Sequence, residues 1–254
     1  MKLSVVIPAF NEGARLGPSL ERVLAYLATR AEPSEVIVVD DGSGDDTAAV
    51  AAAFAERGVR LVRLPENRGK GAALRGGVAV SRGARVLLCD ADLSTPIEEV
   101  ERLEEQLAGS EIVIGSRSIA ASEITVRQPR FREWMGRVFN RILRLVGLAS
   151  FRDTQCGFKL LRGEVARELF AALRIERFAF DVELLWLAQR RGLRIAEVGV
   201  RWADSAGSRV HPVRDSLNML LDVLALRWRS WREEGRRRPR AAPSGAETPN
   251  GTGD

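Results

Sequence analysis

Histidine, cysteine and tyrosine are scarce in this sequence of 254 residues. The absence of any histidine besides His211, to which we assign no catalytic role, argues against a His-based triad or a zinc site. The two cysteines, Cys89 and Cys156, lie far apart and lack the spacing of a metal motif. We therefore expect both thiols to be reduced, as in a cytoplasmic protein.

Long apolar runs are also absent. No stretch reaches the ~18–20 residues that a membrane-spanning helix needs. The apolar run at residues 3–7 is short and predicts a strand rather than a signal peptide. We expect a cytoplasmic protein that does not cross a membrane but can lie on its inner face.

Lysine occurs only three times, as Lys2, Lys70 and Lys159, so arginine carries nearly all of the positive charge. The formal net charge is +5. Because arginine forks match phosphate geometry better than lysine does, the bias fits a phosphate-binding surface, although an arginine-rich genome explains it equally well. The length suffices for one large α/β domain or two small ones.

Short apolar runs alternate with helical patterns over the first 117 residues. Five buried strands are expected at residues 3–7, 36–39, 59–64, 86–89 and 112–114, with helices at 16–29, after 45 or 46, at 70–81 and after 95. This alternation predicts an α/β fold with a Rossmann-like, mostly parallel sheet flanked by helices.

The pattern changes beyond residue 117. We expect a loop at 118–130, amphipathic helices at 131–148 and 212–231, a further helix at 180–190, and strands that end near residue 161 and span 195–202. Residues 233–254 have the composition of a disordered basic tail. The sequence thus predicts one domain, residues 1–232, with halves at 1–117 and 118–232.

Polar residues follow four of the five expected strands. They are Pro8 to Glu12, Asp40-Asp41, Asp90-Ala91-Asp92 and Gly115-Ser116-Arg117. Ligands of parallel sheets bind beyond the carboxyl ends of the strands, so we expect these groups to share one rim.

Asp90 and Asp92 lie two residues apart at such a strand end. Two close carboxylates repel each other unless one is protonated or a cation lies between them. Mg²⁺ and Mn²⁺ prefer oxygen ligands and often share a site with substrate phosphates. The pattern therefore predicts a divalent ion bound with a diphosphate, or else an acidic loop that caps the helix near Pro96.

Two further segments are candidates for nucleotide binding. The turn Asp40-Asp41-Gly42-Ser43 could bind ribose or base, or be an ordinary tight turn. In Asn67-Arg68-Gly69-Lys70-Gly71, glycines allow close approach of the backbone and Lys70 suits an anion. This segment is not a Walker A motif, and no G-x-G-x-x-G follows the first strand, which argues against a nicotinamide enzyme.

Taken in order, the segments at residues 4–12, 38–43, 67–71 and 90–92 resemble the inverting glycosyltransferases of family two, which have the GT-A fold. The segments at 115–117, 153–159, 178–185 and 207–210 are similar to those of polyprenyl-phosphate sugar transferases. Among these, the chain most resembles dolichyl-phosphate β-glucosyltransferases, with mannosyl-phosphate-dolichol synthases close behind.

The resemblance implies roles by position. Residues 1–117 would bind the nucleotide sugar and residues 118–232 the acceptor. Nucleotide-sugar contacts would come from Pro8, Ala9, Phe10, Glu12, Asp41, Asn67, Lys70, Asp90 and Ala91. Asp90 and Asp92 would bind Mg²⁺ or Mn²⁺. The catalytic candidates are Asp92, Asp181, Arg117, Lys159 and Gln155, and the phosphate or acceptor contacts are Arg117, Arg130, Arg132 and Arg209.

The resemblance implies a metal-dependent hexosyltransferase that transfers glucose from UDP-glucose to a polyprenyl phosphate. GDP-mannose is the alternative donor, and a soluble phosphorylated acid the alternative acceptor. A phosphate acceptor is largely dianionic at neutral pH and needs no base. Asp181 could then orient the sugar or Lys159, act as a base, or simply face its helix dipole.

Arginines beside the apolar stripes of residues 131–148 and 212–231 predict peripheral association with a membrane surface. Two other classes are less well supported. A sugar nucleotidyltransferase would carry a glycine-rich loop where Pro8 to Glu12 stand. A nucleic-acid partner is not expected, since there is one tyrosine and no stacking motif.

Overall fold

The computed structural model describes residues 2–126, 136, 138, 141, 143–144, 151–204 and 212–237. Most of the helix expected at 131–148 falls outside these residues. Arg130, Arg132 and Arg209, expected to face phosphates, also lie outside the described residues.

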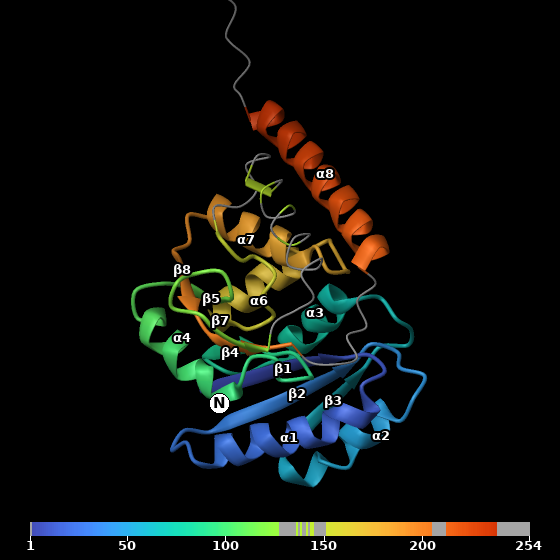
Figure 1. Ribbon diagram of the computed structural model, residues 1–254. Coiled ribbons are helices and arrows are strands. Elements are labelled where there is room, and N and C mark those ends of the chain that lie inside the picture. Colours follow the sequence, from blue (N-terminus) through green and yellow to red (C-terminus); the bar gives the residue numbers. More distant parts are fainter. Residues whose placement is uncertain are drawn as a thin grey trace, which may run out of the picture.

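A seven-stranded sheet forms the centre of the molecule, with the strand order β3-β2-β1-β4-β7-β5-β8 (Figure 1). The strands are β1 (Leu3–Ala9), β2 (Ser34–Asp40), β3 (Val59–Arg63), β4 (Arg85–Leu88), β5 (Ile112–Ser116), β7 (Lys159–Arg162) and β8 (Ile195–Gly199). Strand β7 runs antiparallel between β4 and β5, and the other pairs are parallel. The expectation of a mostly parallel α/β sheet is confirmed.

Helices cover both faces of the sheet (Figure 1). They are α1 (Gly13–Ala28), α2 (Thr47–Ala52), α3 (Lys70–Val80), α4 (Val100–Leu107), α6 (Gly163–Ala172), α7 (Phe180–Arg190) and α8 (Pro212–Arg237), with short 3₁₀ turns at Ala55–Arg57 and Ile97–Glu99. Neighbouring strand residues point to opposite faces, so Val5 packs with α1, α2 and α4, whereas Val6 packs with α3, α6, α7 and α8.

Two expectations for the second half are wrong in detail. The expected loop at 118–130 contains a strand, β6 (Glu123–Val126), and the expected strand at 195–202 is split into β8 and β9 (Arg201–Ala203). Strands β6 and β9 pair in a separate two-stranded sheet. The chain crosses between the sheets at Gly199, where an added Cβ would lie 2.5 Å from the backbone of Ala121.

Two helices also differ from expectation. Helix α6 was not expected, because Gly163 and the charged residues that follow it obscure the helical spacing of its apolar residues. Helix α8 continues to Arg237, past the expected end at Trp231 and into the segment expected to be a tail. Among the described residues, no helix combines the length and apolar character needed to cross a bilayer.

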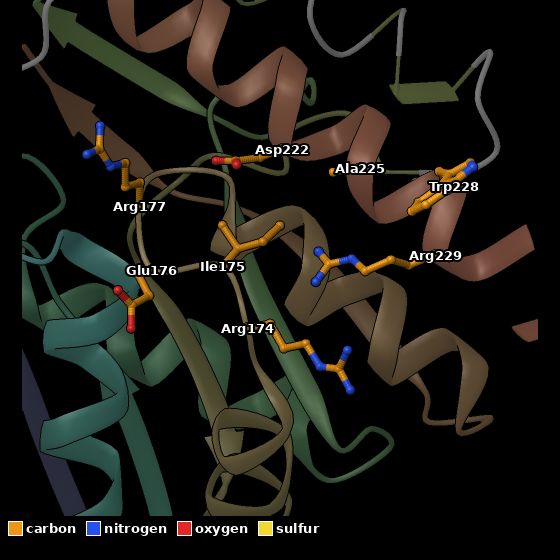
Figure 2. Close-up of a pocket in the computed structure, with 8 residues that line it drawn as sticks. All are labelled: Arg174, Ile175, Glu176, Arg177, Asp222, Ala225, Trp228 and Arg229. Atoms are coloured by element: carbon orange, nitrogen blue, oxygen red, sulfur yellow. The ribbon is translucent and has the colours of Figure 1, made fainter. Parts of the chain in front are cut away.

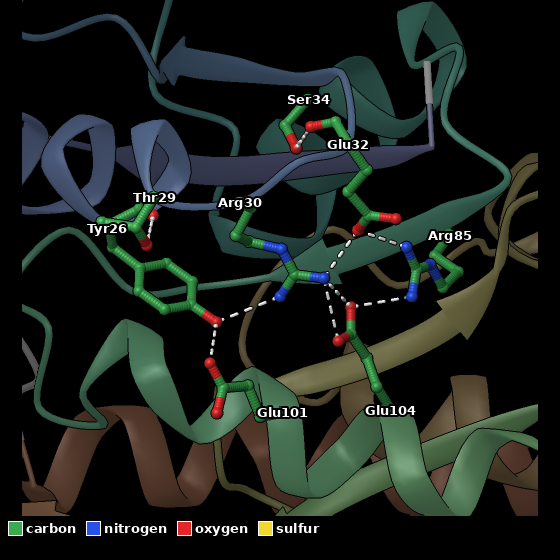
Figure 3. A network of polar contacts seen from close by, with 8 residues as sticks. All are labelled: Tyr26, Thr29, Arg30, Glu32, Ser34, Arg85, Glu101 and Glu104. Atoms are coloured by element: carbon green, nitrogen blue, oxygen red, sulfur yellow. Dashed lines mark hydrogen bonds and ion pairs between the residues drawn. The ribbon is translucent and has the colours of Figure 1, made fainter.

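An ion-pair network ties elements together at the amino ends of the strands (Figure 3). The Arg30 guanidinium donates to Glu32 at 2.6 Å, to Glu104 at 2.9 Å and to the Tyr26 hydroxyl at 3.0 Å. Arg85, at the start of β4, pairs with both Glu32 and Glu104. Since this network lies at the far end of the sheet from the expected rim, we assign it to stability.

Candidate functional site

Asp90 lies just beyond β4, where it meets the first residue of α3. The Lys70 ammonium lies 2.5 Å from Asp90 Oδ1, and both side chains are partly exposed. Burial opposes ionisation of Asp90, but the charges of Lys70, Lys159 and Arg117 outweigh it and hold the pKa of Asp90 below its ordinary value. Asp90 is therefore a carboxylate already engaged by a cation.

The loop before β7 packs directly on this carboxylate. A Cβ added to Gly157 would lie 2.1 Å from Asp90 Oδ2, so only glycine fits there without displacement. Gly157 thus brings the second half of the chain into contact with the first at the rim. Next to it, Gln155 Nε2 is buried and has no hydrogen-bond partner in the described part of the chain.

Lys159 and Asp181 form a buried ion pair behind this loop. Lys159 begins β7 between the ends of β4 and β5, and Asp181 lies in the first turn of α7. Their Nζ and Oδ1 atoms are 2.6 Å apart, and the ammonium also donates to the Cys156 carbonyl at 2.5 Å. The side chains are 0% and 4% exposed. Burial raises the pKa of Asp181, although Lys159 and Lys70 oppose the shift.

Arg117 follows β5 and is held in place by a second carboxylate. Its Nε and Nη2 atoms donate to the two oxygens of Asp153 at 2.7 and 2.9 Å, and its backbone N–H donates to the same side chain. Glu197 of β8 accepts the backbone N–H of Asp153 at 2.9 Å. The Arg117 charge outweighs desolvation and lowers the pKa of Asp153 to about 2. The guanidinium also lies over the Trp202 ring, 5.5 Å from its centroid.

At the part of the rim expected to bind the nucleotide, Asp41 supports the loop before α3. Its two carboxylate oxygens accept the N–H groups of Arg68 at 2.9 Å and Gly69 at 2.8 Å. Gly69 has a φ of 109°, a conformation that favours glycine. Asp41 is 3% exposed, and burial raises its pKa. Its expected contact with a nucleoside remains a prediction.

The end of β1 is tied to the turn after β2. Asn11, with a φ of 53°, donates its N–H to the Ser43 hydroxyl at 2.9 Å, and Glu12 donates its N–H to Thr47 at 2.8 Å. The Glu12 carboxylate forms a two-point pair with Arg15 at 2.6 and 2.7 Å. These contacts fix the backbone on which the expected nucleotide contacts lie.

Expected site residues differ in how the structure places them. Asp90, Arg117, Lys159 and Asp181 come together with Lys70, and Gln155 lies in the adjoining loop. The remaining nucleotide candidates range from buried to exposed: Ala9 and Ala91 are buried, Pro8 and Phe10 partly exposed, and Asn67 exposed. Sequence reasoning missed Asp153, Glu197, Gly157 and Arg15. Asp153 opens the recognised segment at 153–159, whereas nothing local marks Glu197.

The carboxylates fit a divalent ion in part. Within the described residues no cluster of three or more His, Cys, Asp or Glu side chains is suited to a metal. Asp92 Oδ1 accepts the Ser94 N–H at 3.0 Å, while Asp90 Oδ2 faces the Cβ-free surface of Gly157. Two partly exposed carboxylates suit an ion that takes its other ligands from a diphosphate and water.

These features define a glycosyltransferase of the GT-A type. The structure of Mycobacterium tuberculosis glucosyl-3-phosphoglycerate synthase with Mn²⁺, UDP-Glc and phosphoglyceric acid is 26% identical, with a TM-score of 0.66 over 89% of this chain and 80% of that one. Mannosyl-3-phosphoglycerate synthase from Rubrobacter xylanophilus is 22% identical, with a TM-score of 0.67 over 97% and 79%, and supports the fold alone.

The family model for glycosyl transferase family 2 matches residues 4–170, and the chain belongs to that family. Dolichyl-phosphate beta-glucosyltransferase of Mus musculus is 41% identical over 251 residues, which cover 91% of this chain and 78% of that protein. The enzyme of the same name from Homo sapiens is 39% identical, with coverages of 93% and 79%. The expected fold, family and enzyme class are confirmed.

Proposed function

We propose that this protein transfers glucose, with inversion, from UDP-glucose to a polyprenyl phosphate. The observation that carries this proposal is 37–41% identity, over about nine-tenths of the chain, to four dolichyl-phosphate beta-glucosyltransferases. The rim agrees with it, because Lys70, Lys159 and Arg117 surround the acidic Asp90. Such a set of cations suits two phosphate-bearing substrates.

Departure of UDP needs stabilisation of the charge that builds on its diphosphate. Asp90 and Asp92 would hold Mg²⁺ or Mn²⁺, which supplies Lewis-acid stabilisation of that charge when bound. Lys70 begins α3, so its ammonium and the helix N-terminus would both bind the diphosphate. The similarity to a synthase crystallised with Mn²⁺ and UDP-Glc supports the use of a divalent ion with this donor.

The acceptor phosphate needs positioning rather than deprotonation. A phosphate oxygen attacks the anomeric carbon from the face opposite UDP, and the bond to the β-phosphate oxygen breaks with its electrons leaving on UDP. Arg117, fixed by Asp153, would orient this phosphate. Asp181 is engaged by Lys159, so we assign it to positioning Lys159 and the sugar rather than to proton transfer.

Helix α8 would hold the enzyme peripherally on the inner face of a membrane. A stripe of apolar side chains along it is between 49% and 67% exposed: Leu217, Leu221, Leu224, Trp228 and Trp231. Arg232 stacks over Trp228 at 3.7 Å. An apolar stripe beside arginines is typical of helices that lie in the headgroup region.

The test is incubation of the protein with UDP-glucose, GDP-mannose and a short-chain polyprenyl phosphate, with and without EDTA. We expect a glucosylated lipid, only from UDP-glucose and only without EDTA. Asp92→Asn should lower the rate at least ~10²-fold, since it weakens leaving-group stabilisation. Glu21→Gln, which alters an exposed pair with Arg57 away from the rim, is the control. Absence of lipid product from every donor would refute the proposal.

A soluble phosphorylated acid is a second candidate acceptor. It is favoured by the similarity to the synthase whose structure contains phosphoglyceric acid. Replacing the lipid by phosphoglyceric acid in the same assay separates the two acceptors. A hydroxyl acceptor would need a base, so it would also revive that role for Asp181.

A further inference from the structure

A cavity of about 440 Å³ lies between α8 and the segment that joins α6 to α7 (Figure 2). Arg174, Ile175 and Arg177 line it from the segment, and Asp222, Trp228 and Arg229 line it from α8. None of these residues belongs to the rim described above, and the proposed reaction does not use this cavity.

Positive charge dominates the cavity. Its lining includes three arginines and two acidic residues, but Glu176 is engaged by Arg68 and by Arg75, the latter at 2.8 Å. Asp222 is the remaining carboxylate, and burial raises its pKa. Figure 2 shows the side chains of Arg174 and Arg229 extending from opposite walls, one from the segment and one from α8. Guanidinium groups are suited to binding a phosphate group.

One donor of the cavity lacks a hydrogen-bond partner. The charges of Arg177 and Arg229 act on the nearby Asp222 carboxyl, but Arg229 Nε is a buried donor with no hydrogen-bond partner in the described part of the chain. A buried donor without an acceptor is costly, so an anion in the cavity would be stabilised there.

Trp228 connects the cavity to the exposed stripe of α8. It lines the cavity and is also a member of the apolar row from Leu217 to Trp231. A ligand that carries a phosphate beside apolar chains would therefore fill the cavity and cover the stripe together. We infer that Arg174 and Arg229 bind the headgroup phosphate of an anionic phospholipid while α8 lies in the bilayer surface. This inference rests on the membrane association proposed above.

A second copy of the chain fits this surface less well. Arg227 and Arg232 lie beside the stripe, and Arg229 lines the cavity. Symmetric pairing of two α8 helices would bring these like charges together. An anionic bilayer instead neutralises them, with each basic residue near the surface adding to binding.

The experiment measures co-sedimentation with vesicles of phosphatidylcholine alone and of phosphatidylcholine with phosphatidylglycerol. The test protein carries Arg174→Gln and Arg229→Gln. The matched control carries Arg60→Gln and Arg82→Gln, which remove the same charge from exposed positions in β3 and in the loop before β4. We expect the cavity variant to lose at least ~10-fold in affinity for the anionic vesicles, and the control less than ~3-fold. Equal losses of vesicle affinity in both variants would refute the headgroup site and show that general electrostatic attraction accounts for the binding.

Two further arms separate the alternatives. Inorganic phosphate, titrated into the wild type without vesicles, should bind at Arg174 and Arg229 much more weakly than the anionic vesicles do, because free phosphate cannot cover the apolar stripe. Phosphate binding as tight as vesicle binding would assign the cavity to soluble phosphate and refute the headgroup. Glucosyl transfer by the wild type to detergent-dispersed polyprenyl phosphate tests the proposed reaction separately. Its failure alongside selective vesicle binding would refute the reaction and leave the headgroup site standing. Urea unfolding of each variant confirms that it is folded.

Discussion

Replacing Asp181 by asparagine tests how the buried pair at the rim contributes to stability and rate. The change leaves Lys159, which is 0% exposed, without a counter-ion 2.6 Å away. Breaking one side of a buried ion pair costs about 3–5 kcal/mol. Lys159 keeps the Cys156 carbonyl as an acceptor, so we expect the lower end, ~3 kcal/mol. For a chain of this size that corresponds to a fall in Tm of about 6–12 °C.

The double variant Lys159→Met with Asp181→Asn distinguishes the contribution of the ion pair from the contributions that each residue makes on its own. Once Lys159 is neutral, the loss of Asp181 no longer strands a buried charge. The double variant should therefore lose about 2 kcal/mol less than the sum of the single losses. If Asp181 acts on the reaction by positioning Lys159, the two behave as a unit. The double variant then has the kcat of the slower single variant rather than the product of both defects.

Urea unfolding with linear extrapolation measures the stabilities, and the rate of glucose transfer at saturating donor measures kcat. If Asp181→Asn had the stability of the wild type, the ion pair between Lys159 and Asp181 would not stabilise the contact between β7 and α7. Additive losses in stability would show that the two charges are independent. Multiplied defects in kcat would return Asp181 to the role of a base.

Three other changes test the remaining features. The pKa of Asp153 falls from 3.8 to about 2 on folding, so this carboxylate stabilises the fold above pH 4 and loses that contribution, ~2 kcal/mol, as the pH falls towards 2. In urea unfolding between pH 2 and 6, Asp153→Asn should therefore weaken the dependence of the unfolding free energy on pH. An unchanged pH dependence would contradict this assignment. Lys70→Met should raise the affinity for Mn²⁺ several-fold, measured by calorimetry without nucleotide, because Asp90 loses a competing cation. Equal or weaker affinity would count against a metal at Asp90. Arg30→Met, at the far end of the sheet, should lower the free energy of unfolding by ~1–2 kcal/mol in urea and leave kcat/KM unchanged. A change in kcat/KM would show that the ion-pair network affects the residues of the rim.

The sequence was sufficient to predict the first half of the fold and the position of the rim. Buried parallel strands are continuous apolar runs, and turn residues follow each of them, so β1 to β5 lie close to where they were expected. The second half was harder, because its strands are short and pair over long distances. Lys159–Arg162 is inserted antiparallel between β4 and β5, and nothing local to either of those strands marks the gap that it fills.

The pairing of charges was also beyond the sequence. Lys70, Arg117, Lys159 and Asp181 were expected at the site, but each could have faced the substrate freely. In the fold, every one of the three cations instead has a carboxylate: Lys70 has Asp90, Arg117 has Asp153, and Lys159 has Asp181. Sequence spacing cannot reveal these pairs, since each joins residues that are brought together only by the tertiary structure.

This pairing has a physical reason in a site that receives two phosphate-bearing substrates. Three cations held close together without anions would repel one another and would lose hydration on burial. The carboxylates offset part of that cost in the free enzyme, and the two kinds of pair then behave differently. Lys70 and Asp90 are partly exposed, so their contact could open if, as proposed, a diphosphate and a divalent ion bind the two charges. Lys159 and Asp181 are buried, so their contact persists and fixes the position of a cation. The partly exposed pair of Lys70 and Asp90 is therefore the one that substrates could disrupt, whereas the buried pair of Lys159 and Asp181 maintains the geometry of the site.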